Sequence, residues 1–394
     1  MIFLRAAQRE FTQNAVAVFV ALFAILISTV LIRLLGQAAG GRVPADAVLA
    51  LIGFGAIAQM PVVLSLTLFS GISGSALADA AGPGSMMVKM MDKAGYGRPY
   101  AAALTASTAI VGPIIPPSVS MIIYALQDEN VSVGGLFMAG FIPGILIALA
   151  MAAVNWWVCK KRDYRSTEPR PSAREMWSTS FKAIPALMLI VLIVVGIRFG
   201  IFTPTEASVV AVFYALVCGK WVYRTLKWSA LPGILARSAM LTASVLLVMA
   251  TSAAFAWVLT VEGIPQYLSE LIVSWELSPV MFLIAVNILL LVFGIFMEPL
   301  PGVMILVPIL APIAFSLGID PTHFAMVVIV NLTLGMITPP VGGLLFVTAV
   351  STRVSITELT REMPLFLLAH FVVLCLLTFI PALSTWLPHT LGFQ

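Results

Sequence analysis

The stretch Gly112-Pro-Ile-Ile-Pro-Pro-Ser118 decides the fold, because its pattern recurs 223 residues later as Gly335-Met-Ile-Thr-Pro-Pro-Val341. The match extends beyond the prolines, since Val131-Ser-Val133 returns as Val354-Ser-Ile356 at the same offset. Both copies interrupt long apolar segments. A membrane offers no water to unpaired backbone groups, so a helix interrupted at membrane depth must line a cavity enclosed by protein. Matching interruptions in two halves of a chain indicate a binding site between inverted repeats.

The composition predicts that most of the chain faces lipid. Of its 394 residues, 61% are hydrophobic and 10% are charged, and the mean hydropathy is +1.07. The apolar runs do not alternate with polar residues, as the strands of a transmembrane barrel would. We therefore expect an all-α fold, a polytopic transmembrane helical bundle with inverted repeats, re-entrant hairpins and broken helices. Runs of roughly 20 residues, enough to cross a bilayer, lie at about 14–36, 47–69, 100–125, 135–159, 183–202, 206–223, 238–260 and 364–387.

The basic residues indicate which side of the membrane is cytoplasmic. The net charge is +4, but Lys and Arg lie in short loops beside apolar runs, which is the positive-inside pattern rather than a nucleic-acid surface. The most basic loop, 160–182, is therefore expected in the cytoplasm and the protein in the inner membrane. Counting spans from this loop places the turns at Gly95 and Gly318 on opposite faces, as an inverted duplication requires.

No enzyme chemistry is indicated by the sequence. Cys159, Cys218 and Cys375 have neither a paired nor a metal-ligand spacing. Ser73 lacks the Gly-x-Ser-x-Gly surroundings of a serine nucleophile, and no histidine lies near it. We expect no cofactor and no metal other than a coupling ion.

Small polar residues lie at the two interruptions of the first repeat. The segment Ser70-Gly-Ile-Ser-Gly-Ser75 places glycines and hydroxyls where a hairpin tip would lie, and Asp79 follows it. The second interruption ends at Ser118. Prolines remove backbone donors, and glycines let carbonyls turn inward. Freed carbonyls and hydroxyl oxygens together form the oxygen cage that a small alkali cation needs.

The second repeat has the same two features. Its tip is expected at Glu298, and its break runs from Asn331 through Thr333 and Thr338 to Gly343. Helix N-termini that face the same cavity favour an anion, by ~0.3–1 kcal/mol each when exposed. The sequence therefore predicts a site that binds a cation together with an organic anion.

Structural roles compete with these interpretations. Ser and Thr in helices often bond to the carbonyl of the preceding turn, so Thr333, like Thr105 and Ser107, can simply pack a helix. A single Pro-Pro break can be a kink. Asp79 and Glu298 differ, because an ionisable group in a membrane segment marks a functional pathway unless it reaches the interface.

From about residue 69 onward these motifs resemble the large membrane subunit of tripartite ATP-independent periplasmic (TRAP) transporters, the dicarboxylate and sialic-acid group. The resemblance rests on Phe69-Ser-Gly-Ile-Ser-Gly-Ser-Ala-Leu-Ala-Asp-Ala80, 101–107 with 112–118, Phe202-Thr-Pro-Thr-Glu-Ala207, and 331–343. It implies sodium-driven import of a small organic acid by an elevator movement. It also implies two partners, a soluble periplasmic binding protein and a small membrane subunit.

The resemblance implies two sodium regions with the substrate between them. The first would comprise Ser73, Gly74, Ser75, Gly112 and Pro116, and the second Glu298, Thr333, Gly335, Thr338 and Gly342. Asp79, Ser118 and Asn331 complete the set of candidate binding residues. No side-chain constellation distinguishes a dicarboxylate from sialic acid.

Residues 1–68 resemble a different family. Arg5, Arg9-Glu10 and the stretches 31–42 and 51–54 are similar to the first two helices of ABC-type lipopolysaccharide-export permeases, so the chain is interpreted as a fusion with its junction near Leu68 to Ser70. An export-complex subunit with a passive remainder is therefore the alternative function. The predicted domains are an N-terminal two-helix segment (1–69), a first transport repeat (70–159), a cytoplasmic loop with linking helices (160–237) and a second inverted repeat (238–394).

Overall fold

The computed structural model describes residues 63–164, 184–263, 267 and 278–393, except residues 68, 71, 72, 187, 190 and 198. All of them belong to one unit, which runs from Ala56 to Gln394. The described residues are mostly helical and contain no strand, which confirms the predicted all-α class. The expected span at 14–36, and nearly all of that at 47–69, lie outside the described residues.

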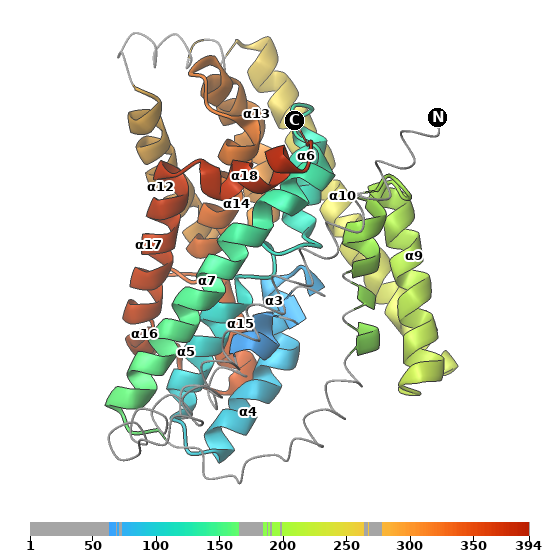
Figure 1. The fold of residues 1–394 in the computed structure, drawn as a ribbon, viewed down its shortest axis with the longest axis vertical. Coiled ribbons are helices and arrows are strands. Elements are labelled where there is room, and N and C mark those ends of the chain that lie inside the picture. Colours follow the sequence, from blue (N-terminus) through green and yellow to red (C-terminus); the bar gives the residue numbers. More distant parts are fainter. Residues whose placement is uncertain are drawn as a thin grey trace, which may run out of the picture. The chain divides into compact units, whose positions relative to one another are not determined.

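The helices occur in three groups along the chain (Figure 1). The first group contains α3 (Ala76–Asp79), the π-helical turn η1 (Ala80–Gly84), α4 (Ser85–Lys93), α5 (Arg98–Ala109), α6 (Val119–Gln127) and α7 (Val133–Lys161). The middle group contains α9 (Pro204–Val217), η2 (Cys218–Val222), η3 (Trp228–Ala230) and α10 (Leu231–Val261). The last group contains α12 (Pro279–Phe296), α13 (Pro299–Ser316), α14 (Pro321–Gly335), α15 (Gly343–Thr352), α16 (Ile356–Glu362), α17 (Pro364–Phe379) and α18 (Ala382–Thr390).

Residues that lie 223 positions apart in the sequence occupy equivalent positions in the structure. Gly95 and Gly318, which follow α4 and α13, both have positive φ, 90° and 75°, a conformation that glycine adopts without steric cost. Ser132 and Ser355 cap α7 and α16 with their side chains, as expected for residues at helix N-termini. Each repeat therefore contains a hairpin, a broken helix and a long helix in the same order.

Each hairpin reaches the break of its own repeat, while each broken helix also packs on the other repeat. Helices α12 and α13 are joined by Met297 and Glu298 alone, and in Figure 1 this hairpin lies above the one that contains α3 and α4. Helix α6 packs against α13, and α15 packs against η1 and α4. The two repeats are thus interlocked, and we call the hairpins and broken helices (63–127 and 279–352) the core.

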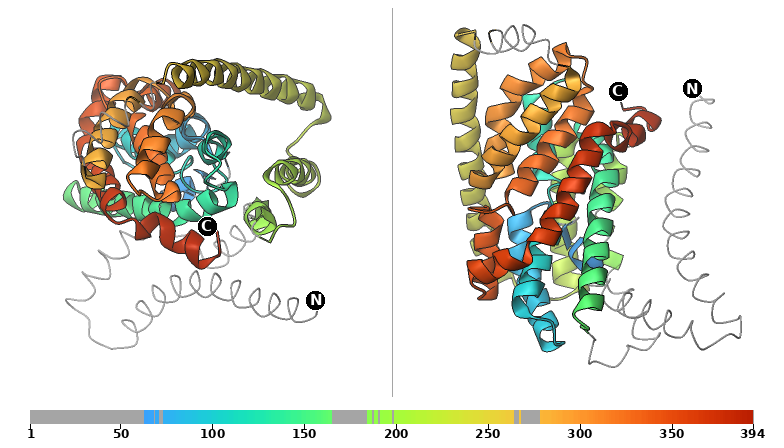
Figure 2. Two further views of the ribbon diagram at one scale, coloured as in Figure 1. Left: turned by 90° about the horizontal axis from the view of Figure 1, so that it is seen from above. Right: turned by 90° about the vertical axis from the view of Figure 1, so that its left-hand side faces the viewer.

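The described residues include helices suited to a membrane. Four are long and apolar enough to cross it, namely α7, Thr205–Val222, α12 and α13, and α16 with α17 forms a fifth candidate bent by 54°. Helices α7 and α17 contact each other and run side by side along the core (Figure 2). The predicted polytopic bundle is confirmed, although the expected span at 364–387 is divided, because α17 ends at Phe379 and Pro381 is the N-cap of α18.

Candidate functional site

The tip of the first hairpin lies against the first Gly/Pro break. Gly74 turns the chain there with a φ of 64°, and a Cβ atom on it would lie 2.5 Å from the Pro117 carbonyl oxygen. The Ser75 N–H donates to Ser73 Oγ at 3.1 Å, which closes the turn. Only glycine adopts this backbone conformation and also leaves room for so close an approach. The absence of a side chain at position 74 therefore lets the tip pack against the break.

A buried carboxylate lies behind this tip. Asp79 is 1% exposed, and neither of its carboxylate oxygens accepts a hydrogen bond from the described residues. The hydroxyl groups of Ser70 and Ser73 lie beside it, outside hydrogen-bond geometry. A Cβ atom on Gly112 would come within 2.8 Å of Asp79 Oδ2 and 3.3 Å of the Ser75 nitrogen. A buried carboxylate without a partner is costly, so this position suits a cation.

The remainder of the first break is held by a helix cap. Ser118 Oγ donates to the Pro113 carbonyl at 2.5 Å and accepts from the Met121 N–H at 3.2 Å, so it caps α6. Pro116 is buried, and its peptide bond to Pro117 is cis, as is the bond between Pro339 and Pro340 in the second repeat. The roles of Ser118 and Pro116 as ligands stay predictions.

In the second repeat, backbone carbonyls gather around Gly342. This residue has a φ of 54°, and its N–H donates to the Ile295 carbonyl of the hairpin at 3.1 Å. A Cβ atom on Gly342 would lie 3.0 Å from the carbonyl oxygens of both Met336 and Thr338. Glu298 lies exposed at the N-cap of α13, with no side-chain cap bond. Four predicted residues of this region, Gly335, Thr338, Gly342 and Glu298, therefore lie at or beside the tip and the break.

Two other predicted residues of the second repeat make contacts inside the helix bundle. Thr333 Oγ1 donates to the Ile329 carbonyl of its own helix at 2.6 Å. Asn331 Nδ2 donates to the carbonyl oxygen and Oδ1 of Asn287 at 2.9 and 2.6 Å, and Asn287 Nδ2 donates to Thr378 Oγ1 at 3.0 Å. The sequence reasoning missed Asn287, although it is the single polar side chain of the apolar segment 279–296. Whether Asn331 and Thr333 also bind a ligand stays a prediction.

The tip of the first hairpin and the break of the second repeat lie in one region of the core. Helix α15, which begins directly after Gly342, packs against α3, which begins directly after Ser75. The oxygens available there are a carboxylate, hydroxyls and backbone carbonyls. Hard cations prefer these ligands, so the residues present fit an alkali cation. Helices α6 and α15 also begin at the two breaks, and their N-termini carry partial positive charge.

A helical membrane bundle in which duplicated hairpins meet duplicated broken helices has the architecture of a secondary transporter. The family described as "Tripartite ATP-independent periplasmic transporter, DctM component" matches residues 5–383 of the chain. The chain belongs to this family. It is an inner-membrane transport protein and not an enzyme.

Individual relatives agree with this assignment. The chain is 40% identical over 335 residues to the sialic acid TRAP transporter large permease protein SiaM of Vibrio cholerae, covering 85% of this chain and 78% of SiaM. It is 41% identical over 332 residues to the C4-dicarboxylate TRAP transporter large permease protein DctM of Pseudomonas aeruginosa, covering 84% and 77%. The YdaH transporter of Alcanivorax borkumensis has a similar fold, with a TM-score of 0.58 at 17% identity over 91% of this chain and 90% of that one.

These comparisons correct the interpretation of the N-terminal residues. The family match begins at residue 5, inside the segment 1–68 that was assigned to an export permease. A fusion with a junction near Leu68 to Ser70 is therefore not supported, and neither is the alternative export function. Apolar runs flanked by arginines, such as Arg5 and Arg42, occur in many inner-membrane proteins because of the positive-inside rule, so they carry little family information.

Proposed function

We propose that this chain is the large permease subunit of a sodium-coupled transporter that imports small organic acids, such as C4-dicarboxylates or sialic acid. The observation that carries the proposal is the unpartnered, buried carboxylate of Asp79 where a hairpin tip meets a helix break. A bound sodium ion would neutralise this carboxylate, with the hydroxyl of Ser73 and nearby backbone carbonyls as further ligands. The carbonyls around Gly342 offer a second position of the same chemistry.

An anionic substrate is supported by two observations. The relatives at 40% and 41% identity are named for sialic acid and for C4-dicarboxylates, which both carry carboxylate groups. Helices α6 and α15 both begin at the breaks, and helix N-termini favour negative charge. We place the substrate between the two tips, where a carboxylate would meet both helix ends and the bound cations.

The mechanism and the partners belong to the same proposal. We propose that the two interlocked repeats move together as an elevator against a fixed scaffold, which the packing of each repeat on the other supports. We further propose a small membrane subunit and a periplasmic substrate-binding protein as partners. The support is membership of a family whose description is that of a tripartite periplasmic transporter.

Thermal unfolding of the full chain in sodium chloride and in choline chloride, at equal ionic strength, tests the proposal. Binding to the native state adds RT ln(1 + [L]/Kd), so sodium at about 100 Kd should add roughly 2.7 kcal/mol. Ser73→Ala and Thr338→Val should reduce this increment. Thr348→Val is the matched control, because its Oγ1 bonds to the Leu344 carbonyl at 2.8 Å as that of Thr338 bonds to Leu334 at 2.9 Å.

Two outcomes would contradict sodium binding at these tips. One is equal stability of the unaltered chain in the two salts. The other is a sodium increment that Thr338→Val and Thr348→Val reduce to the same extent. Substrate class is then read from sodium-driven uptake of labelled succinate and sialic acid by cells that contain the chain with its partner proteins.

A further inference from the structure

The turn between α9 and α10 is rich in aromatic and basic residues. Its sequence is Lys220-Trp-Val-Tyr-Arg-Thr-Leu-Lys-Trp228, in which three of nine residues are aromatic and three are basic. No acidic residue occurs between Glu206 and Glu262. We call residues 218–230, which comprise η2, η3 and the residues between them, the aromatic–basic turn. This composition is typical of a membrane interface, where aromatic rings lie at the level of the lipid headgroups.

Backbone hydrogen bonds fold the aromatic–basic turn back on its own beginning. The Tyr223 N–H donates to the Cys218 carbonyl at 2.8 Å. The N–H groups of Thr225 and Leu226 both donate to the Gly219 carbonyl, at 2.9 and 3.0 Å. A Cβ atom on Gly219 would lie 3.2 Å from Leu226 Cβ, so the two ends of the turn are in contact. The turn is therefore a closed local structure, in which the side chains have a defined arrangement.

An arginine occupies the position where this turn reverses. Arg224 has a φ of 54°, a left-handed conformation that is uncommon for a residue with a side chain. Glycine would adopt the same conformation without steric cost, so the shape of the turn does not by itself explain an arginine there. An unfavourable backbone conformation points to a role for the side chain that it carries. The guanidinium group forms two parallel hydrogen bonds with a phosphate group, which is one such role.

The side chains of the turn are exposed. Trp221 and Trp228 are 60% and 58% exposed, and Arg224 and Lys227 are exposed as well. Lys220 Nζ lies 5.4 Å from the centre of the Trp228 ring, a distance at which a cation is attracted to an aromatic face. Tryptophan has an apolar body and a polar N–H group, so it suits the boundary between acyl chains and headgroups better than water. The turn thus presents both rings and positive charges to its surroundings.

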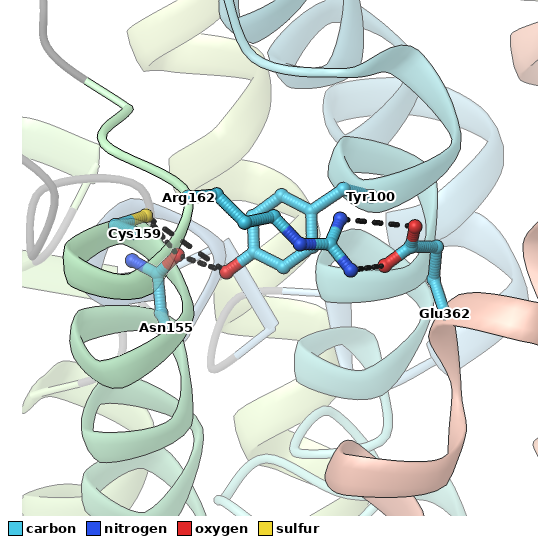
Figure 3. Close-up of polar contacts among 5 residues, drawn as sticks. All are labelled: Tyr100, Asn155, Cys159, Arg162 and Glu362. Atoms are coloured by element: carbon cyan, nitrogen blue, oxygen red, sulfur yellow. Dashed lines mark hydrogen bonds and ion pairs between the residues drawn. The ribbon is translucent and has the colours of Figure 1, made fainter.

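Carboxylates do not neutralise these charges in the part of the chain that the structure describes. Arg162 shows what a neutralised cation looks like here, because it binds Glu362 through both guanidinium nitrogens, at 3.0 and 2.7 Å (Figure 3). None of the described ion pairs includes a basic residue of the aromatic–basic turn. The three basic side chains of the turn therefore suit an anion from outside the described residues.

Two tyrosines place the turn beside the end of the most basic loop, 160–182. The Tyr223 hydroxyl accepts from the Ala186 N–H at 3.2 Å, and the Tyr214 hydroxyl of α9 donates to the Pro185 carbonyl at 2.7 Å. Pro185 and Ala186 follow the basic loop closely in the sequence. Because that loop is expected in the cytoplasm, the turn is expected at the cytoplasmic surface of the membrane. Anionic lipids give this leaflet a negative surface potential.

Apolar surface borders the turn along both helices. Val212 and Phe213 of α9 and Leu235 of α10 are exposed. Phe213 and Leu235 are each separated from the nearer tryptophan of the turn by roughly 10–12 Å of helix rise. The segment Thr205–Val222 is also long and apolar enough to cross a membrane. Apolar, aromatic and basic surfaces thus follow one another, and a lipid bilayer meets all three from its acyl chains to its headgroups.

We propose that the aromatic–basic turn binds the headgroups of anionic phospholipids in the cytoplasmic leaflet and so fixes the depth of α9 and α10 in the membrane. Arg224 and Lys227 contact the phosphate group, and Trp221 and Trp228 lie at the boundary between headgroups and acyl chains. Arginine suits this role because its planar donor groups match the geometry of a phosphate. The surface is separate from the hairpin tips, and the proposal goes beyond the proposed function without depending on it.

Native mass spectrometry of the full chain in detergent, titrated with lipid, tests the proposal. Dioleoyl phosphatidylglycerol is the anionic probe, and dioleoyl phosphatidylcholine, which has the same acyl chains and a zwitterionic headgroup, is the reference. The unaltered chain should bind the anionic lipid more tightly. Arg224→Gln and Lys227→Gln should each weaken this binding about fivefold, the contribution of one basic residue near an anionic surface, and should leave phosphatidylcholine binding unchanged. Equal affinities of the unaltered chain for the two lipids would overturn the proposal.

The chain offers matched controls for both kinds of side chain. Arg353 is exposed and left-handed, with a φ of 56°, but no aromatic residue lies within six positions of it. Arg353→Gln should therefore leave the affinity for phosphatidylglycerol nearly unchanged. Trp228→Leu should weaken the binding, whereas Trp257→Leu should not, since Trp257 is 68% exposed near the other end of α10. Equal losses in Arg224→Gln and Arg353→Gln would overturn the proposal, because total charge and not the turn would then be recognised.

The same measurement separates a lipid from two other occupants. Inorganic phosphate in large excess should not displace phosphatidylglycerol, because it lacks the acyl chains that meet the aromatic and apolar surfaces. Displacement by phosphate would overturn a lipid as the occupant. Loss of lipid binding when the chain is purified together with the proposed small membrane subunit would do the same, since a protein would then cover the turn. The titration requires neither sodium nor substrate, so its outcome is independent of the test of sodium coupling.

Discussion

Gly335 of α14 packs backbone to backbone against Gly294 of α12, so closely that a Cβ atom on Gly335 would lie 2.5 Å from the Gly294 Cα atom. In lipid, small residues let helices approach in this way and gain van der Waals contact. The contact holds the second hairpin against the broken helix directly before its Pro-Pro break. The geometry around Gly342 therefore depends on the absence of side chains at Gly294 and Gly335.

The first prediction follows from this contact. We expect Gly335→Ala to lower the free energy of unfolding by about 1–3 kcal/mol, because the added methyl group meets backbone that must shift. Gly82→Ala is the control, since no atom lies within 4 Å of a Cβ atom placed there, and it should change stability by less than about 0.5 kcal/mol. Unfolding in detergent measures both variants, and equal losses would show that the close approach has no energetic consequence.

The second prediction concerns the unpartnered carboxylate of Asp79. We expect Asp79→Asn to stabilise the chain in choline chloride, because a buried charge without a partner is removed. The same variant should lose the additional stabilisation by sodium, since the anionic ligand is gone. Asp92→Asn, which alters an exposed pair with Arg98, should change stability by at most about 1 kcal/mol in either salt. Lower stability of Asp79→Asn in choline, with an intact sodium response, would contradict the assigned role.

The third prediction separates packing from binding at Asn331. We expect Asn331→Ala to cost about 0.6 kcal/mol and at most about 1.7 kcal/mol, the average and the maximum measured for hydrogen bonds between membrane helices, because two bonds to Asn287 are lost. A double-mutant cycle with Asn287→Ala should give a coupling energy of similar size. Additive effects of the two substitutions would show that the bonds contribute nothing to stability. Loss of the sodium response in Asn331→Ala would instead support its predicted role as a ligand.

The hairpins and breaks could be predicted because their signals are local. Local residue types restrict or release the backbone at their own positions, as Gly74, Gly342 and the paired prolines do. The constant offset identified the duplication.

The candidate site was predicted in part. Asp79 was singled out by its charge alone, but the carbonyls of Ile295 and Met336 could not be, because every residue type carries a carbonyl and only the backbone path decides where it points.

Contacts between distant segments could not be predicted from residue types. Arg162 was placed in a polar cytoplasmic loop, whereas it caps α7 and pairs with Glu362, 200 residues away. Asn331 was expected at the break, yet the rotation of α14 directs its amide to Asn287. Such orientations depend on how helices pack against one another, and the apolar composition around these residues is compatible with several rotations.

Two identical inverted copies of one architecture would present the same structure to both faces of the membrane, since exchanging the copies would map the arrangement onto itself. The copies are not chemically equal, however. At the offset of 223, Asp79 corresponds to Gly302, and Glu298 corresponds to Ser75. Each copy therefore carries a carboxylate where the other has a small residue. Any difference in stability between the inward-facing and outward-facing states must arise from such departures from symmetry, or from segments outside the duplication, and not from the helical scaffold itself.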